Sequence, residues 1–340
     1  MKRRLFKRAL PLLLSCIAPL AVNAAATTQV QKKLSTVDLA PVVVSGVLPG
    51  PALWKVSKGD HVMWVLGTVS TLPRNMQWET AAVERAVQGS QAVLGEPGVR
   101  IKAHLGFWNT VLLLPSALGF KKLPHGEKLK DVLPPDMYAR WETQRSRYLR
   151  HAWGVERLRP FFAGKKLYKA AIDTMGLTSD GGVRGAVMGF ARAAHVPVIK
   201  TAYTFVVKNP RADVKLYKQA ELDDQSCLGS VLDATEDGLA QATARANAWA
   251  TGSLDELRKT LSGRQDGACL SALTDTTFAA KIGATDIPAH MRESWLGAAE
   301  AALARNSQTF ALLPMQEILA SDGYIAALKQ AGYTISAPSE

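Results

Sequence analysis

The sequence lacks the short motifs that mark several common enzyme classes. It has no G-x-x-x-x-G-K-[ST] phosphate loop, no G-x-G-x-x-G fingerprint, no H-E-x-x-H or C-x-x-C pair and no G-x-S-x-G elbow. Its six histidines do not pair at metal-ligand spacing. These absences argue against P-loop enzymes, Rossmann dehydrogenases, zincins and α/β-hydrolases.

Long hydrophobic runs are also missing, because no stretch after the N-terminal region is long and apolar enough to span a bilayer. Residues 1–24 instead have five basic side chains, then an apolar run from Ala9 to Val22, then Val22-Asn23-Ala24. This order is typical of a secretory signal peptide cleaved after Ala24. We therefore expect a periplasmic or secreted protein without a stable transmembrane anchor. An uncleaved anchor and a lipoprotein signal ending at Cys16 are the alternatives.

Acidic residues are outnumbered, with 29 Asp+Glu against 41 Lys+Arg and a formal net charge of +12. The signal accounts for five of the basic residues, which leaves 36 basic against 29 acidic residues, or +7. This moderate charge gives little support for nucleic-acid binding, and no nucleic-acid partner is expected.

Cysteine is scarce, with three in the whole chain. Cys16 lies in the signal, so Cys227 and Cys269 remain as an even pair for an oxidising compartment. We predict that they form a disulfide between two helical segments. Two buried free thiols are the alternative.

The pattern after the signal predicts a linker and then one domain. Residues 25–50 have no sustained helical period and end at a Pro-Gly turn, with one candidate strand at Pro41–Ser45. The domain is expected over residues 51–337, with a largely helical middle section at 101–175.

Strand and helix patterns alternate along this domain. A hairpin of residues 52–57 and 61–66 leads to a helix around 82–87 and a strand at 92–95, which ends at Glu96. The ends of the last two strands in this unit are expected to lie side by side. Further strands are predicted at three places: 196–199, buried; 309–313, in the core; and 333–336, at an edge. The prediction is an α/β fold, or α+β as the alternative, with a central mixed β-sheet covered by helices.

Several blocks of the sequence resemble the TraB/GumN family, which includes the TIKI-type metalloproteases. The resemblance rests on Pro51-Ala52-Leu53-Trp54-Lys55-Val56, Leu66-Gly67-Thr68-Val69-Ser70-Thr71-Leu72-Pro73, Gly181-Gly182-Val183, Ala248-Trp249 with Gly252, Arg292 with Trp295, and the layout of residues 309–332. It implies a TIKI-like fold and a divalent-metal hydrolytic centre. That centre would be built from two G-x-x-H motifs, a Glu at a strand end and an Arg.

The chain departs from this pattern at both histidines. The first motif has Gly67 but ends in Ser70, and the second aligns with Pro314 to Glu317. A Ser hydroxyl is a poor metal ligand, and the loss of two histidine ligands should exceed the roughly 10–100-fold cost of losing a supporting partner. We therefore expect no cofactor. Mn, Co or Zn would bind only at a retained site, with Glu96 and Glu317 as ligands.

Glu96 and Arg292 match the retained Glu and Arg and, by resemblance, are the candidate catalytic residues. An ion pair between them is one expectation. Lys200, at the end of the predicted strand 196–199, is a second candidate for a cation beside Glu96.

Three hypotheses follow for function. The first is an exported, non-catalytic relative of metal-dependent hydrolases with a binding or interaction role. The second is an active metallopeptidase-like hydrolase with a rebuilt site. The third is a module that binds an anionic envelope component. It rests on basic residues between Arg140 and Lys166, interleaved with Trp141, Tyr148 and Trp153. For that stretch, a solvated helix face with inward-packed aromatic rings is the favoured expectation.

Overall fold

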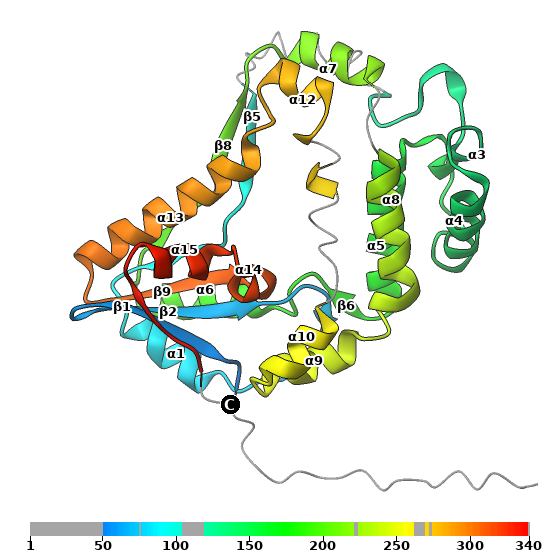
Figure 1. Ribbon diagram of the computed structural model, residues 1–340. Helices are drawn as coiled ribbons and strands as arrows, with labels where there is room; N and C mark the ends of the chain where they lie inside the picture. Colours follow the sequence, from blue (N-terminus) through cyan, green and yellow to red (C-terminus); the bar gives the residue numbers. More distant parts are fainter. Residues whose placement is uncertain are drawn as a thin grey trace, which may run out of the picture. The chain divides into compact units, whose positions relative to one another are not determined.

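The computed structural model describes residues 50–74, 76–103, 119–220, 224–261, 269–271 and 274–338, and of Asp237 and Gly238 only the backbone. All of these residues belong to the unit Val47–Glu340 (Figure 1). The predicted signal, most of the predicted linker and the candidate strand at Pro41–Ser45 lie outside the described residues.

A six-stranded mixed sheet forms the centre of this unit, which confirms the predicted fold class. The predicted hairpin is present as β1 (Leu53–Lys58) and β2 (His61–Thr68), which pair antiparallel. The strand order is β10-β1-β2-β9-β4-β7. The other members are β10 (Thr334–Ser336), β9 (Gln308–Pro314), β4 (Val93–Leu94) and β7 (Val198–Ile199).

Strand β9 lies between β2 and β4 and is parallel to both. The expectation that the ends of β2 and β4 are adjacent is therefore wrong, because a strand from the far end of the sequence separates them. The predicted buried strand near residue 198 is instead the edge strand β7, in which Val198 is 43% exposed. The carboxyl ends of the parallel strands β2, β9, β4 and β7 all lie at one edge of the sheet.

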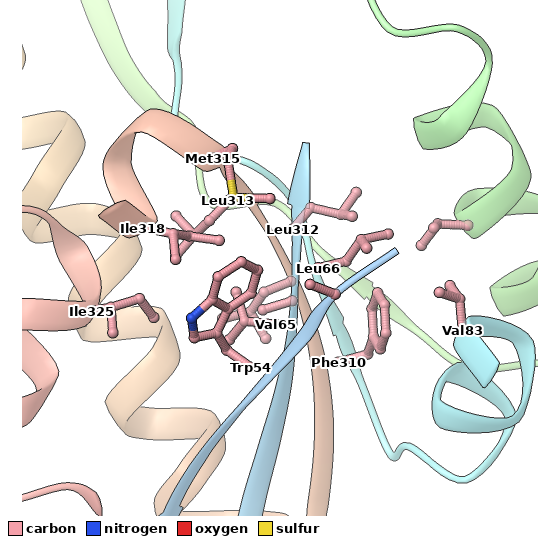
Figure 2. Packing of buried hydrophobic residues seen from close by; sticks show 14 of the residues in the cluster. Trp54, Val65, Leu66, Val83, Phe310, Leu312, Leu313, Met315, Ile318 and Ile325 are labelled. Atoms are coloured by element: carbon pink, nitrogen blue, oxygen red, sulfur yellow. The ribbon is translucent and has the colours of Figure 1, made fainter. Parts of the chain in front are cut away.

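Helices cover both faces of the sheet because its strands carry apolar side chains on both sides. Figure 2 shows Phe310 and Val83 on one side of the strands, and Trp54, Ile318 and Ile325 on the other. The helices that pack against the sheet or flank it include α1 (Ala81–Gln88), α6 (Val183–Ala193), α13 (Ile287–Arg305), α14 (Met315–Leu319) and α15 (Tyr324–Gln330).

The described part of the middle section, from residue 119 on, is mostly helical and buries a second apolar cluster around Trp141. Helices α5 (Pro160–Thr174) and α8 (Asp224–Asp233) pack against each other beside α4 (Pro135–Tyr148) (Figure 1). The other helices of the described residues are α3 (Leu129–Val132), α7 (Pro210–Gln219), the π-helical turn Ala234–Gly238, α9 (Ala242–Ala250), α10 (Leu254–Thr260), α12 (Thr277–Ile282) and the 3-10 turns Pro124–Gly126 and Val155–Arg157.

Two short sheets complete the described structure. Strand β3 (Leu72–Pro73) pairs antiparallel with β6 (Leu177–Thr178), and β5 (Val99–Ala103) pairs parallel with β8 (Tyr203–Val207). The predicted helical section thus begins with the end of a strand, since residues 101–103 belong to β5. No helix within the described ranges is long and apolar enough to cross a membrane.

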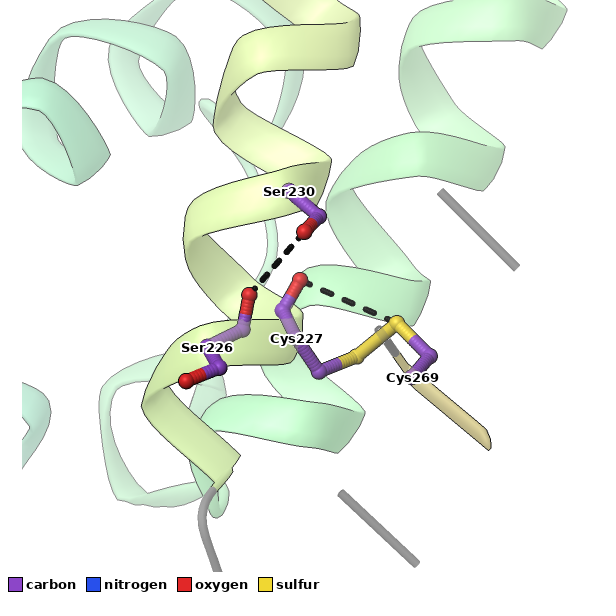
Figure 3. Close-up of a disulfide and its surroundings, with 4 residues drawn as sticks. All are labelled: Ser226, Cys227, Ser230 and Cys269. Atoms are coloured by element: carbon purple, nitrogen blue, oxygen red, sulfur yellow. Dashed lines mark hydrogen bonds between the residues drawn. A yellow bond between two sulfur atoms is a disulfide. The ribbon is translucent and has the colours of Figure 1, made fainter. Parts of the chain in front are cut away.

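The predicted disulfide between Cys227 and Cys269 is confirmed (Figure 3). It joins α8 to a short helical stretch at residues 269–271, across 42 positions of sequence. The Sγ of Cys269 lies 3.7 Å from the carbonyl oxygen of Cys227. The bond therefore fixes one face of α8 in the helical middle section.

Candidate functional site

A small cavity lies at the carboxyl ends of β2, β9 and β4, the edge where open α/β sheets usually bind ligands. Its volume is about 120 Å³. Three of its lining residues lie at or just after the ends of these strands. Thr68 is the last residue of β2, Pro314 is the last residue of β9, and Glu96 follows β4 by two residues. The lining residues are Thr68, Val69, Ser70, Glu96, Ser179, Asp180, Arg184, Leu261, Pro314 and Gln316.

Glu96 is the most enclosed carboxylate of this cavity, with 16% of its side chain exposed. The Thr68 hydroxyl donates to its Oε1 at 2.5 Å across the end of β9. Arg184 donates to its Oε2 and forms an ion pair with it. Both carboxylate oxygens of Glu96 are therefore already held by groups of this chain.

The backbone around Glu96 is fixed from two sides. The Thr201 hydroxyl lies within hydrogen-bonding distance of the carbonyl oxygens of Gly95 and Glu96, at 2.9 and 2.7 Å. The indole of Trp295 donates to the carbonyl of Gly95 at 3.0 Å. The Glu96 carboxylate is thus presented from a rigid strand end.

Arg184 lines this cavity but does not stand out in the sequence. It lies in the first turn of α6, which begins directly after Gly181 and Gly182, and both glycines have positive φ. A Cβ on Gly181 would come within 2.8 Å of Leu72, so this turn needs glycine. A cation near a helix N-terminus is opposed by the helix dipole. Carboxylates offset this, since Glu96 pairs with Arg184 and Asp180 lies 3.9 Å away.

Ser70 lines the cavity and is exposed, and the residue after it is strained. Thr71 has φ +65°, a left-handed conformation that costs a β-branched residue free energy. Its amide donates to Ser179 at 3.2 Å, its carbonyl accepts from Arg245 at 3.5 Å, and its hydroxyl bonds to Tyr168. These contacts keep the Ser70 loop in one conformation.

Gly67 is closely packed. A Cβ there would come within 2.4 Å of the methyl group at the end of the Met315 side chain, and the indole of Trp249 donates to the Gly67 carbonyl at 2.6 Å. A side chain at position 67 would therefore require Met315 of α14 to move.

Two other predicted site residues point elsewhere. Glu317 does not line the cavity and lies near Tyr324 instead. Burial of the Tyr324 phenol and, to a smaller extent, the negative charge of Glu317 raise the pKa of Tyr324 to about 12. Arg292 donates to the carbonyl of Gly323 at 3.1 Å, and its guanidinium lies 5.3 Å from the Tyr324 ring centroid. Within the described residues, Glu96 therefore pairs with Arg184 and not with Arg292.

Lys200 is not a partner of Glu96 either. It is exposed and is not among the lining residues of the cavity. The idea that a side-chain cation stands beside Glu96 holds, but the residue is Arg184 from helix α6.

The cavity does not fit the divalent-metal centre that the resemblance implies. Thr68 and Ser70 offer neutral hydroxyls, Gln316 offers a neutral amide, and Pro314 offers no side-chain ligand. The two carboxylates of the cavity, Glu96 and Asp180, both face the Arg184 cation. No group of three or more His, Cys, Asp or Glu able to hold a metal ion occurs in the described part of the chain. Glu96 and Glu317 do not line the same cavity, so they do not form the alternative oxygen site.

The basic stretch between Arg140 and Lys166 is engaged within the fold only in part, and several of its cations are exposed. Arg140 pairs with Asp233 and Glu236 at 2.6 Å each, and Arg145 pairs with Glu142 at 2.5 Å. Among the aromatic rings, Trp141 is fully buried and Tyr148 half-buried, but Trp153 is 95% exposed. The expectation of inward-packed rings is therefore wrong for Trp153, which follows the end of α4 in a turn.

The sequence model of the TraB/PrgY/gumN family matches residues 52–337. This match covers most of the chain and confirms the family resemblance. Searches of curated proteins and of solved structures gave no match.

Proposed function

The chain belongs to the TraB/PrgY/gumN family, and on this premise we propose that it is an exported, non-hydrolytic member that acts by binding. The observation that carries the proposal is the Arg184–Glu96 pair. It places the chain's own cation on the carboxylate that the family resemblance assigns to a metal-dependent site.

Three further features support this proposal. The position of the first motif histidine is Ser70, the second motif has Pro314 in place of its glycine, and Glu317 points away from the cavity. The supports around the site nevertheless persist, since the Trp249 and Trp295 indoles both hold strand-end carbonyls there. A pocket whose carboxylates are paired with a cation of the same chain, beside neutral hydroxyls, is suited to recognition rather than to activation of a metal-bound water.

Export is the second part of the proposal. The basic and apolar residues 1–24 support it, and so does the Cys227–Cys269 disulfide, because such bonds persist in oxidising compartments. Mass determination of the protein recovered from the periplasm or medium tests it, with a chain that begins at Ala25 as the expected result. Recovery of the unprocessed chain in the cytoplasm would contradict export.

The non-hydrolytic part is tested by peptide hydrolysis. The purified protein is incubated with a mixed peptide pool and Mn²⁺, Co²⁺ or Zn²⁺, beside Glu96→Gln as the matched control. We expect no cleavage by either protein. Metal-dependent cleavage by the unaltered protein that is lost in Glu96→Gln would contradict the proposal and favour the metallopeptidase-like alternative.

A further inference from the structure

Trp153 is the most exposed large apolar side chain of the described residues. Its exposed fraction is 95%, whereas the next highest value is 67%, at Ile101. Large aromatic side chains usually bury most of their surface, so an indole in water is unfavourable unless it serves a contact.

The backbone around Trp153 is well anchored. Leu149 and Val155 on either side are 6% and 1% exposed and belong to the second apolar cluster. The amide of Ala152 donates to the Leu149 carbonyl at 2.9 Å, and Gly154 turns the chain with φ +73°. The fold therefore holds the indole outward from a tight turn.

Exposed cations lie close to this turn along the chain. Arg150 and Arg157 lie three residues before and four residues after Trp153, and both are exposed. The amide of Leu123 donates to the Arg157 carbonyl at 2.8 Å, and Lys122 forms a β-bridge with Leu158. This bridge places the exposed Lys122 beside the segment that follows Arg157. We call Lys122, Arg150, Trp153 and Arg157 the Trp153 surface.

We propose that the Trp153 surface binds an anionic lipid bilayer. The Trp153 indole lies at the headgroup level, where amphipathic rings are favoured, and the cations contact lipid phosphates. The charge of the surface complements an anionic membrane face. Arg140 and Arg145 take no part because carboxylates of the chain already pair with them.

An acidic polysaccharide fits the geometry less well. Sugar-binding rings usually form the wall of a cleft, together with planar polar side chains that bond to hydroxyls. A ring that is 95% exposed has almost no neighbouring atoms to form such a wall. A protruding indole between cations matches insertion into an interface better.

The proposal is tested by vesicle co-sedimentation of the protein purified after export, with its mass recorded. Vesicles contain phosphatidylcholine alone or phosphatidylcholine with phosphatidylglycerol. We expect binding only when phosphatidylglycerol is present, and weaker binding as salt is added. Trp153→Ala should bind at least about tenfold more weakly because the inserted apolar surface is lost. Arg150→Gln and Arg157→Gln should each bind about fivefold more weakly.

Ile101→Ala is the matched control, since it removes the second most exposed apolar side chain from strand β5. It should bind like the unaltered protein. Equal vesicle binding by Trp153→Ala, or no binding of the unaltered protein to phosphatidylglycerol vesicles, would overturn the proposal. Binding to dextran sulfate without binding to vesicles would also overturn it and assign the surface to an acidic polysaccharide. Because Trp153 packs against little, its variant should keep the thermal midpoint, which excludes misfolding as the cause.

Discussion

Two arginine–carboxylate pairs in this molecule differ in where they lie and what surrounds them. In the helical middle section, Arg159 pairs with Asp224 at 3.3 Å, and their side chains are 8% and 4% exposed. At the strand ends, Arg184 pairs with Glu96, and their side chains are 49% and 16% exposed. The first pair is buried with its surroundings, whereas the second opens onto a cavity.

The buried pair is built into the backbone. Arg159 also donates to the carbonyls of Tyr217 and Ala220, at 2.7 and 2.5 Å, and its guanidinium lies 4.9 Å from the Tyr217 ring centroid. Arg184 has carboxylates of Glu96 and Asp180 as its ion partners instead. The comparison indicates that Arg159 serves the fold, while Arg184 is exposed to the cavity that it lines.

The largest effect is expected from Asp224→Asn. This change leaves the Arg159 cation buried beside a neutral amide, and breaking a buried pair costs about 3–5 kcal/mol. The free energy of unfolding in urea should fall by that amount. A loss below about 1 kcal/mol for Asp224→Asn would remove the distinction between the two pairs.

The disulfide tests the same section, since Cys227 lies on α8 with Asp224. The bond closes a 42-residue loop, so Cys227→Ala with Cys269→Ala should lower the free energy of unfolding by about 2–4 kcal/mol. Urea titration with and without a reductant measures this. The reductant should destabilise the unaltered protein but leave the double variant unchanged. An equal response of both proteins would contradict a stabilising role of the disulfide.

Tyr324 provides a test of where a third arginine, Arg292, lies, because the Arg292 guanidinium packs on the Tyr324 ring. Burial raises the pKa of Tyr324 to about 12, from an ordinary value near 10. The folded protein thus holds the phenol proton more tightly than the unfolded chain does. The stability that the protonated phenol contributes is fully present below pH 10 and is lost as the pH rises toward 12. At pH 11 the loss of this contribution lowers the free energy of unfolding by about 1 kcal/mol.

The matched variant Tyr324→Phe keeps the ring that packs on Trp295 and removes the titrating proton. Urea unfolding at pH 9 and pH 11 should show a smaller decline for this variant than for the unaltered protein. An identical decline would mean that the Tyr324 phenol is not buried against Arg292 in the way described.

The smallest effect is expected from Arg184→Ala. A partly exposed ion pair contributes about 1 kcal/mol or less, so the free energy of unfolding should change no more than that. Arg192→Ala is the control, because Arg192 is an exposed arginine on the same helix. A loss near that of Asp224→Asn would contradict the division between a structural pair and a cavity pair.

Much of the fold could be predicted because local patterns determine it. The hairpin around Gly59, the strand before Pro314 and the disulfide partners follow from short-range signals and cysteine parity. The insertion of β9 between β2 and β4 could not, because strand order depends on residues more than 200 positions apart. Periodicity within each strand is the same in either order.

The candidate site was predictable in its carboxylate but not in its cation. Glu96 stood out at a strand end before Pro97, and the resemblance drew attention to Arg292. Arg184 comes to Glu96 only through packing of α6 beside the strand ends, across 88 positions of sequence. One signal was available: a basic residue in the first turn of a helix that opens after Gly181-Gly182, where a cation needs a carboxylate partner.

Under the proposed function, Arg184 is the cation of this cavity in place of a metal ion. Calorimetric titration of Mn²⁺ and Zn²⁺ into the unaltered protein and into Arg184→Ala tests it most directly. We expect no binding to the unaltered protein and weak binding to the variant, in which Glu96 and Asp180 lose their shared cation. Stoichiometric metal binding to the unaltered protein that disappears in Glu96→Gln would contradict it.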